Sequence, residues 1–377
     1  MLVYKAKHNV AKVFIDIIDE ETVKQIYNFL NHPAFADSKI RIMPDTHAGK
    51  GSVIGFTMTM NNYIIPNVVG VDIGCGMLMH KLDAKEIDFV KLDEFIKNEI
   101  PSGFAVQNQK GKDRVKKELW QVRHETFETT SIKVGQTVDV IASLGTLGGG
   151  NHFIEIDKHG DDFYLVVHTG SRNFGLSICN YHQKKAKALM NEMFIGDAYK
   201  NLEFLPMNKG GDEYLKDMYV AQNYANFNRE LIVRRILNDF FKQKNEDTIS
   251  CVHNYIGKDK IIRKGAISAM KGEKVIIPLN MRDGVIVGTG KGNEDWNNSA
   301  PHGAGRILSR KKAKEELTIE EFKTSMEGIY TSCVNGDTLD ESPMAYKDSQ
   351  LIIDAIGDTV DINFIMKPVY NFKAGGE

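Results

Sequence analysis

Five of the 11 histidines stand in short segments rich in glycine, asparagine or aspartate. Such settings are typical of strand ends and tight turns, where rigid elements hold functional side chains. One histidine of this kind is usually structural, but five in similar settings indicate a shared site. They are His47 (PDTHAGKG), His152 (GGGNHF), His168 (VVHTGSR), His253 (CVHNYI) and His302 (APHGAGR). The other six are expected to be surface or core residues: His8, His32, His80, His124, His159 and His182.

A carboxylate and a thiol lie three residues apart in the segment VVGVDIGCGM. Asp72 and Cys75 are bracketed there by glycines, which let the backbone turn tightly enough for both side chains to face one centre. A ligand set that mixes oxygen, sulfur and imidazole nitrogen suits a borderline transition metal better than calcium or magnesium. The alternative is a glycine-rich turn with a buried, inert Cys75, which leaves the pairing of aspartate and cysteine unexplained.

The elements around these residues predict an α/β or α+β fold with mixed sheets, rather than a barrel or a Rossmann domain. Helices are expected after the N-cap Asp19, over about 85–100, over about 213–243, and from a capping box at Thr318 and Glu321 to near Gly328. Short β-branched or aromatic runs predict the strands, which are Lys12–Ile17, Val68–Val71, Phe163–Val167, Val275–Ile277 and Val285–Val287.

The composition fits a globular protein, with 42% hydrophobic and 26% charged residues. We see no repeat or linker, so residues 1–377 are expected to form a single domain. The sequence has no apolar run of membrane length and no apolar leader segment, which predicts a cytoplasmic protein without membrane association. Its four cysteines are far apart and are expected to be reduced.

The net charge of −2 argues against a protein that binds nucleic acid only through a basic surface. Two local basic stretches, 110–117 and 306–314, could contact RNA or be ordinary solvated surface. The segment GVIVGTGKG (residues 284–292) resembles a phosphate-binding P-loop only superficially. Val285 stands where the first glycine should be, and Gly292 replaces the serine or threonine after the lysine.

Taken together, the chain resembles the RtcB family of RNA ligases, which are GTP- and manganese-dependent. The motifs that carry the resemblance are PDTHAGKG, GVDIGCGM, LGTLGGGNHFIEI, VVHTGSRNFG, RKGA, HGAGR and the C-terminal NFK. They run in this order over nearly the whole chain. The family's own fold, with mixed sheets packed face to face and helices around them, is what this resemblance implies.

The resemblance also implies the roles of particular residues. Two Mn²⁺ ions would be bound by Asp72, Cys75, His152, His168 and His253. His302 matches the family's guanylylated histidine, and Asp45 matches an aspartate thought to assist catalysis. GTP would be contacted by Asn151, Phe153, Glu155, Asn280, Ala304, Gly305, Tyr346 and Lys373.

The implied reaction joins an RNA 2′,3′-cyclic phosphate or 3′-phosphate end to a 5′-hydroxyl end, in RNA repair or tRNA splicing. A neutral imidazole is a free base at neutral pH, which suits His302 to attack the α-phosphate of GTP. GMP then passes to the RNA 3′-phosphate, and the 5′-hydroxyl displaces it. An archease-like activator protein is a further partner that the family suggests.

One segment departs from the family's pattern. Where many members have a PGSMGTAS-type segment whose two serines touch the nucleotide, this chain has PLNMRDGV (residues 278–285). Asn280 and Val285 stand at the serine positions, and only Asn280 can form a side-chain hydrogen bond. We therefore expect an altered nucleotide pocket. The chain also looks shorter than several relatives, which suggests a specialised branch that repairs RNA broken by nucleases.

Two other functions are compatible with parts of the pattern. A two-metal phosphoesterase that acts on RNA ends without ligation would use the same aspartate, cysteine and histidines, but would not need His302, Tyr346 and Lys373. A non-catalytic RNA-binding protein would need no metal, and the near-neutral charge argues against it.

Overall fold

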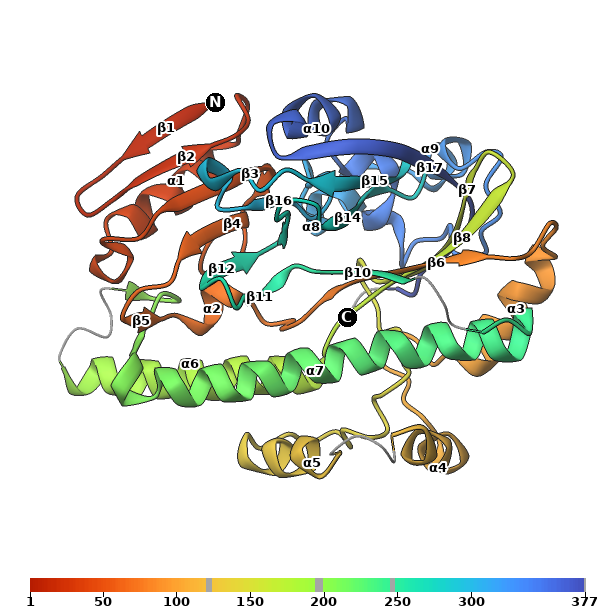
Figure 1. Cartoon of the computed structure of the whole chain (residues 1–377), viewed down its shortest axis with the longest axis horizontal. Coiled ribbons are helices and arrows are strands. Elements are labelled where there is room, and N and C mark those ends of the chain that lie inside the picture. Colours follow the sequence, from red (N-terminus) through yellow and green to blue (C-terminus); the bar gives the residue numbers. More distant parts are fainter. Residues whose placement is uncertain (120–123, 194–198, 245–247, 376–377) are drawn as a thin grey trace.

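The computed structural model of the chain describes residues 1–119, 124–193, 199–244 and 248–375 (Figure 1). The side chain of His124 lies outside the described part. Two large sheets fill the upper part of the view, and the long helices α6 (Arg172–Glu192) and α7 (Gly211–Arg235) run side by side below them. The fold is α/β with several sheets, of which the six-stranded one is mixed; the α/β class is as predicted.

The first sheet has six strands and one parallel pair, β2 with β3. In spatial order the strands are β1 (Leu2–Lys5), β2 (Val10–Val13), β3 (Ile40–His47), β4 (Ile54–Thr59), β12 (Ile261–Lys264) and β11 (Asn254–Ile256). Side chains from β3 and β4, among them Ile42 and Phe56, are buried in one core with residues of α6 and α7 such as Ile178 and Tyr224. The long helices and this sheet therefore share one hydrophobic core.

The second sheet has seven antiparallel strands. In spatial order they are β10 (Thr248–Val252), β6 (Gly76–Leu82), β8 (Asp162–Thr169), β7 (Phe153–His159), β17 (Val360–Phe372), β15 (Gly284–Gly290) and β14 (Lys274–Asn280). One face packs against the small pair β13 (Ala266–Ser268) and β16 (Ser299–Pro301), through Ile267 and Ala300. A second small pair joins β5 (Tyr63–Ile64) and β9 (Leu205–Pro206).

The remaining helices lie around the sheets and beyond the long helices (Figure 1). They are α1 (Glu20–Leu30), α2 (Pro66–Val69), α3 (Phe89–Glu99), α4 (Gln109–Glu118), α5 (His124–Lys133), α8 (Arg310–Glu316), α9 (Ile319–Ser325) and α10 (Ser349–Ala355). Among the described residues, no helix combines the length and the apolar character needed to cross a bilayer.

Helix ends that depend on local capping follow the prediction. Asp19 accepts a hydrogen bond from the backbone N–H of Thr22 at 2.9 Å, and Thr318 and Glu321 form the expected capping box. The helix predicted over 85–100 begins only at Phe89, because Asp88 caps it through the N–H of Lys91. The helix predicted over 213–243 ends at Arg235 and continues as a π-helical segment over 236–241.

Two of the predicted strands are wrong in whole or in part. Val68–Val71 is not a strand, because Pro66 starts the short helix α2 and Gly70, with φ of 107°, ends it. Lys12–Ile17 is strand only as far as Val13. The other three predicted strands lie within β8, β14 and β15, and most of the P-loop-like segment is the strand β15.

Candidate metal and nucleotide site

The Asp72–Cys75 turn joins α2 to β6 and lies against the helix α7. The N–H of Cys75 donates to the carbonyl oxygen of Asp72 at 3.2 Å, which closes the turn. Gly74 has φ of 73°, and a Cβ atom there would lie 2.7 Å from the Cα atom of Gln222. Only glycine fits this close approach, so the sequence of the turn is dictated by its packing.

The seven-stranded sheet brings Cys75 and His168 together at the ends of two neighbouring strands. Cys75 immediately precedes β6, whose first residue, Gly76, pairs with Thr169 at the end of β8. Because β6 and β8 are antiparallel, the start of one lies beside the end of the other, where His168 is located. The two side chains therefore come from neighbouring strands.

The other two histidines of the cluster lie at the same end of the sheet, next to the ends of the adjoining strands. His152 precedes β7, whose first residue, Phe153, pairs with His168. His253 follows β10, whose last residue, Val252, pairs with Gly76. Four neighbouring strand ends thus supply one cluster, although its members are up to 181 positions apart in the sequence (253 minus 72).

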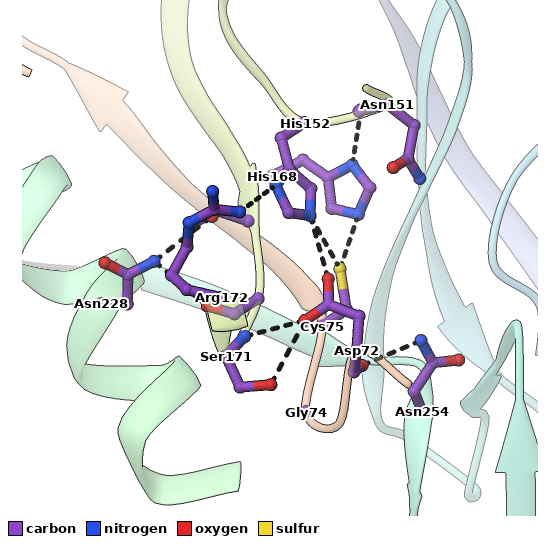
Figure 2. A network of polar contacts seen from close by, with 12 residues as sticks. Asp72, Gly74, Cys75, Asn151, His152, His168, Ser171, Arg172, Asn228 and Asn254 are labelled. Carbon is purple, nitrogen blue, oxygen red and sulfur yellow. Dashed lines mark hydrogen bonds and ion pairs between the residues drawn. The ribbon is translucent and has the colours of Figure 1, made fainter. Parts of the chain in front are cut away.

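The side chains converge on the Cys75 sulfur (Figure 2). Its Sγ atom lies 3.5 Å from Nε2 of His152 and 3.3 Å from Nε2 of His168. Nε2 of His168 lies 3.3 Å from Nε2 of His253, and Nε2 of His152 lies 3.0 Å from Oδ2 of Asp72. Two groups could each hold a metal ion, Asp72 with Cys75 and His152, and Cys75 with His168 and His253.

Hydrogen bonds at the far side of two imidazoles turn their Nε2 atoms toward the cluster. Nδ1 of His152 lies 2.9 Å from the carbonyl oxygen of Leu147, and Nδ1 of His168 lies 3.0 Å from that of Asn151. A carbonyl only accepts, so each Nδ1 carries the proton, and the Nε2 atom of a neutral His168 is unprotonated. Arg172 also lies 3.3 Å from Nδ1 of His152. Because an arginine can only donate, this contact is not a hydrogen bond when Nδ1 carries the proton. The shorter contact with the carbonyl oxygen of Leu147 therefore determines the position of the proton on His152.

The protonation states fit a cation between these side chains. Burial holds the pKa of His168 and His253 well below the usual value, which keeps both imidazoles neutral. Burial works to raise the pKa of Asp72, but its hydrogen bond and charge interaction with His152 hold it below the usual value. Burial and Asp72 raise the pKa of the Cys75 thiol, so a thiolate here needs a compensating positive charge. Nitrogen, sulfur and oxygen donors of this kind suit a transition metal.

His302 lies beside this cluster with its ring fixed by a buried carboxylate. The His302 ring centroid lies 4.7 Å from that of His253. Nδ1 of His302 donates to Oδ2 of Asp45 at 2.6 Å, and Asp45, on β3, is fully buried. Gly305, with φ of 75°, lets the HGAG loop lie against β3, since a Cβ atom there would be 2.1 Å from the carbonyl oxygen of Asp45. Nε2 of His302 is thereby left with a free lone pair.

A cavity of about 730 Å³ opens beside these histidines. Cys75, His168, His253 and His302 all line it, together with His47 from the PDTH segment. Burial lowers the pKa of His47 to about 4, and its Nδ1 lies 3.0 Å from the carbonyl oxygen of Asp45. The cavity is large enough for a nucleotide-sized ligand.

Comparisons with known proteins identify the family of the chain. The family model described as tRNA-splicing ligase RtcB matches residues 25–374. The RNA-splicing ligase RtcB of Escherichia coli (strain K12) is 31% identical, over 94% of this chain and 95% of the relative. The tRNA-splicing ligases RtcB of Methanococcus maripaludis and Archaeoglobus fulgidus are 28% and 27% identical, each over 92% of this chain.

The chain belongs to the RtcB family. The resemblance seen in the motifs is therefore confirmed. Of the residues that it singled out, all but two line the RtcB cavity. The exceptions are Asp45 and His152, which lie behind it and contact His302 and Asp72. The predicted nucleotide contacts along the cavity are Asn151, Phe153, Glu155, Asn280, Ala304, Gly305, Tyr346 and Lys373.

Glu341 is a central residue of the RtcB cavity that the sequence reading missed. Its carboxylate accepts a hydrogen bond from Tyr346 at 2.6 Å and lies 3.3 Å from Nζ of Lys373. Arg306 and Arg310 approach it at 3.2 and 2.8 Å. Although burial works against the charge, Lys373 and the two arginines lower the pKa of Glu341 to about 2. No motif marks Glu341, because its partners come from separate segments.

These ion pairs also place the two basic stretches. Arg306 and Arg310, from the 306–314 stretch, form part of the cavity wall rather than an open basic surface. The 110–117 stretch lies in α4, where Lys112 pairs with Asp139 and Arg114 with Glu118.

The segment 278–285 of this RtcB chain contains no hydroxyl side chain, and Asn280 and Val285 serve local structure. The side-chain oxygen of Asn280 accepts from the backbone N–H groups of Arg282 and Asp283 at 3.0 and 2.9 Å. Its amide donates to the Asp283 carboxylate at 2.7 Å. Val285 is fully buried in the core.

Proposed function

We propose that the chain is an RNA ligase that joins a 2′,3′-cyclic phosphate or 3′-phosphate end to a 5′-hydroxyl end, with GTP and Mn²⁺. The observation that carries this proposal is the placement of His302. Its Nδ1 is held 2.6 Å from buried Asp45, and its ring lies beside the cluster of neutral histidines. The names of the similar proteins, RNA-splicing and tRNA-splicing ligases, support the same activity.

His302 is the group that carries the nucleotide in this proposal. Its Nε2 lone pair attacks the α-phosphorus of GTP, an N–P bond forms, and the bond to the departing pyrophosphate breaks. The imidazole becomes positively charged as the bond forms. Asp45 accepts the Nδ1–H throughout and stabilises that charge, because a buried carboxylate interacts strongly with a neighbouring cation.

The residues that would hold the metal in this proposal are Asp72, Cys75, His152, His168 and His253, and Cys75 belongs to both candidate ligand groups. When bound, Mn²⁺ would supply positive charge for the phosphate groups that react beside His302. The thiolate, the carboxylate and the three imidazoles hold that charge in place, and the carbonyl oxygens of Leu147 and Asn151 orient two of the rings.

Two transfers complete the reaction on the RNA. The cyclic phosphate is first opened by water to a 3′-phosphate. A 3′-phosphate oxygen then attacks the phosphorus on His302, the N–P bond breaks, and His302 regains its lone pair. The 5′-hydroxyl oxygen attacks the activated 3′-phosphate, its proton is lost, and GMP leaves as a 3′,5′ bond forms.

The nucleotide contacts of the proposal line the same cavity. Lys373 packs over the ring of Phe153 with Nζ 5.1 Å from its centroid, and lies near the carbonyl oxygen of Asn151. The adjacent residues Ala304 and Gly305 leave room beside His302. Because the Asn280 side chain is engaged in its own turn, we assign it a structural part in the pocket wall.

A phosphoesterase without ligation is the weaker alternative. It would use the metal ligands but has no need for an imidazole held by a buried aspartate beside a nucleotide-sized cavity. A non-catalytic RNA-binding protein would need neither. We further propose a cytoplasmic location, since the four buried cysteines are free thiols. We also propose an archease-like activator protein as a partner, and family membership is the only support for it.

The test is transfer of label from α-phosphate-labelled GTP to the denatured protein in the presence of Mn²⁺. We expect a covalent adduct with the wild-type chain and none with His302→Ala. The matched control is His159→Ala, which removes an exposed histidine at the end of β7 and should label normally. Label retained by His302→Ala would show that another residue carries the nucleotide.

A further inference from the structure

Two carboxyl groups of the strand β7 are buried next to each other behind the nucleotide pocket. Glu155 and Asp157 are two positions apart in the strand, so their side chains lie on the same face of the sheet. Only 3% of Glu155 and none of Asp157 is exposed. Glu155 lines the cavity, whereas Asp157 is not one of its lining residues.

Asp157 has no conventional donor for its two oxygen atoms. Within the part of the chain that the structure describes, neither oxygen meets an N–H or O–H group. In the neighbouring strand β17, Asp157 lies opposite Pro368, a residue without a backbone N–H. The polar group that Asp157 does meet is the Glu155 carboxyl, which can only accept if it is ionised.

Glu155, in contrast, is surrounded by groups that favour its charged form. The amide of Asn371 donates to its Oε2 atom, and the Lys373 ammonium lies close enough to lower its pKa. Burial nevertheless raises the pKa of Glu155, and burial together with Glu155 raises that of Asp157 further. Two buried carboxylates in contact cannot both be ionised at low cost, so a single proton belongs between them.

We propose that Asp157 carries this proton and donates it to Glu155, so that Glu155 remains an oriented anionic acceptor for the donor edge of a guanine base. The inference rests on the proposed function, in which Glu155 contacts the nucleotide. Asp157 and Asn371 are then positioning residues, which act on the base only through Glu155. Guanine offers two adjacent donors, N1–H and the 2-amino group, whereas adenine presents an acceptor at N1.

Few other charged or titratable groups face the pair. Lys373 approaches from the end of the chain, and Tyr164 lies opposite Asp157 on β8. His168 follows on the same face of β8, opposite Phe153. The layer that covers this face contributes apolar side chains such as Ile267 and Ala304. The pH response of base recognition should therefore belong mainly to the carboxyl pair.

The number of protons on the Glu155–Asp157 pair determines whether the preference for guanine rises or falls with pH. With one proton on the pair, Glu155 is anionic and accepts from guanine. As the pH falls, a second proton binds and Glu155 loses its charge, so the preference for guanine declines. Removing the Asp157 donor takes away a hydrogen bond that lowers the pKa of Glu155. The decline should then begin at a higher pH.

The test compares Asp157→Asn with Asp157→Ala in the full chain with Mn²⁺ bound. The dissociation constants of GMP and AMP are measured by calorimetric titration between pH 5.5 and 8, and their ratio is followed. Phosphate and metal contacts are common to both nucleotides, so they cancel in the ratio. The asparagine amide can still donate but does not titrate. The alanine variant removes the donor.

We expect Asp157→Asn to keep the wild-type preference for GMP. Asp157→Ala should lose at least about tenfold of it near neutral pH, the usual cost of losing a hydrogen bond to a charged group, and should shift its decline to higher pH. Equal preference and equal pH profile in all three proteins would overturn the inference, as would equal losses in both variants, which indicate a merely structural role. If GTP still labels His302 in either case, the proposed ligase function stands while the inference fails.

Discussion

At the scale of single residues, Cys75 has a position that no other described side chain shares. Its sulfur belongs to both groups of potential metal ligands among the described residues, and the Nε2 atoms of His152 and His168 lie within 3.5 Å of it. A thiolate can bridge two cations because it carries a full charge and several lone pairs. Loss of this one atom should therefore weaken both metal positions together.

Cys75→Ala should lower the affinity for Mn²⁺ by more than about tenfold, since even changes outside the ligand set of a metal site cost 10–100-fold. The measurement is metal content after gel filtration over a range of free Mn²⁺. The matched control is Cys179→Ala, which removes a thiol that is equally buried but lies in the core on α6. Unchanged metal binding by Cys75→Ala would remove the sulfur from the site.

The residues of the site were predictable from sequence to different degrees. Asp72, Cys75 and the histidines stand in glycine-rich motifs, so their types and settings were informative before any geometry was known. Glu341 was not predictable, because its importance comes from the three-dimensional meeting of Lys373, Arg306 and Tyr346. A carboxylate in a segment without periodicity or glycine carries no local signal.

At the scale of elements, local chemistry was predictable and packing was not. The N-cap at Asp19 and the capping box at Thr318 depend on residues within four positions, and both are present. The β-branched run Val68–Val71 resembled a strand in isolation. Its helical conformation follows from Pro66 and from burial of Val68 and Val69 in the core shared with α6 and α7.

The C-terminal strand β17 connects the end of the chain to the nucleotide pocket. A terminal lysine is commonly disordered, yet Lys373 is only 7% exposed and lies beside Glu341. Removal of residues 371–377 should suppress formation of the GMP adduct by more than about tenfold, because charged hydrogen-bonding groups are lost from the pocket. Metal binding should change much less.

The adduct yield of two truncations makes this prediction specific. A chain that lacks only residues 374–377 keeps Lys373 and should label almost as well as the full chain. Equal labelling by both truncated chains would mean that neither Asn371 nor Lys373 contributes to the pocket.

A buried histidine at the end of α1 should make stability depend on pH. Burial lowers the pKa of His32 to about 4, so the folded chain binds the proton less readily than the unfolded chain. The free energy of unfolding should therefore fall as the pH drops from about 6.5 toward 4, by up to about 1.4 kcal/mol per pH unit for this group. Above that window its contribution is constant.

His32→Asn isolates the effect. Nδ1 of His32 accepts from the N–H of Ala34 at 3.0 Å, and an asparagine oxygen can accept the same bond without titrating. Urea unfolding at pH 7, 6 and 5 should show a smaller loss of stability with acid in the variant than in the wild type. Parallel losses in the two proteins would assign the acid sensitivity to other groups.

At the scale of the whole molecule, the site gathers residues from both large sheets and from the end of the chain. Asp45 lies on the six-stranded sheet, the metal-ligand cluster lies at the strand ends of the seven-stranded sheet, and Lys373 lies near the C-terminus. These residues span positions 45 to 373, which is nearly the whole chain. We therefore propose that residues 1–377 form one catalytic domain, whose two sheets are both required for nucleotide transfer.

A ligation assay with the four combinations of RNA ends, in the presence of GTP and Mn²⁺, tests the proposed ligase activity most directly. A nucleotide placed on a 3′-phosphate makes that end the electrophile, so the partner end must be a nucleophile. We expect joining only when a 2′,3′-cyclic phosphate or 3′-phosphate meets a 5′-hydroxyl, and a guanosine-capped 3′ end when the 5′-hydroxyl strand is withheld. Joining of a 3′-hydroxyl to a 5′-phosphate, or release of phosphate without any joined product, would contradict it.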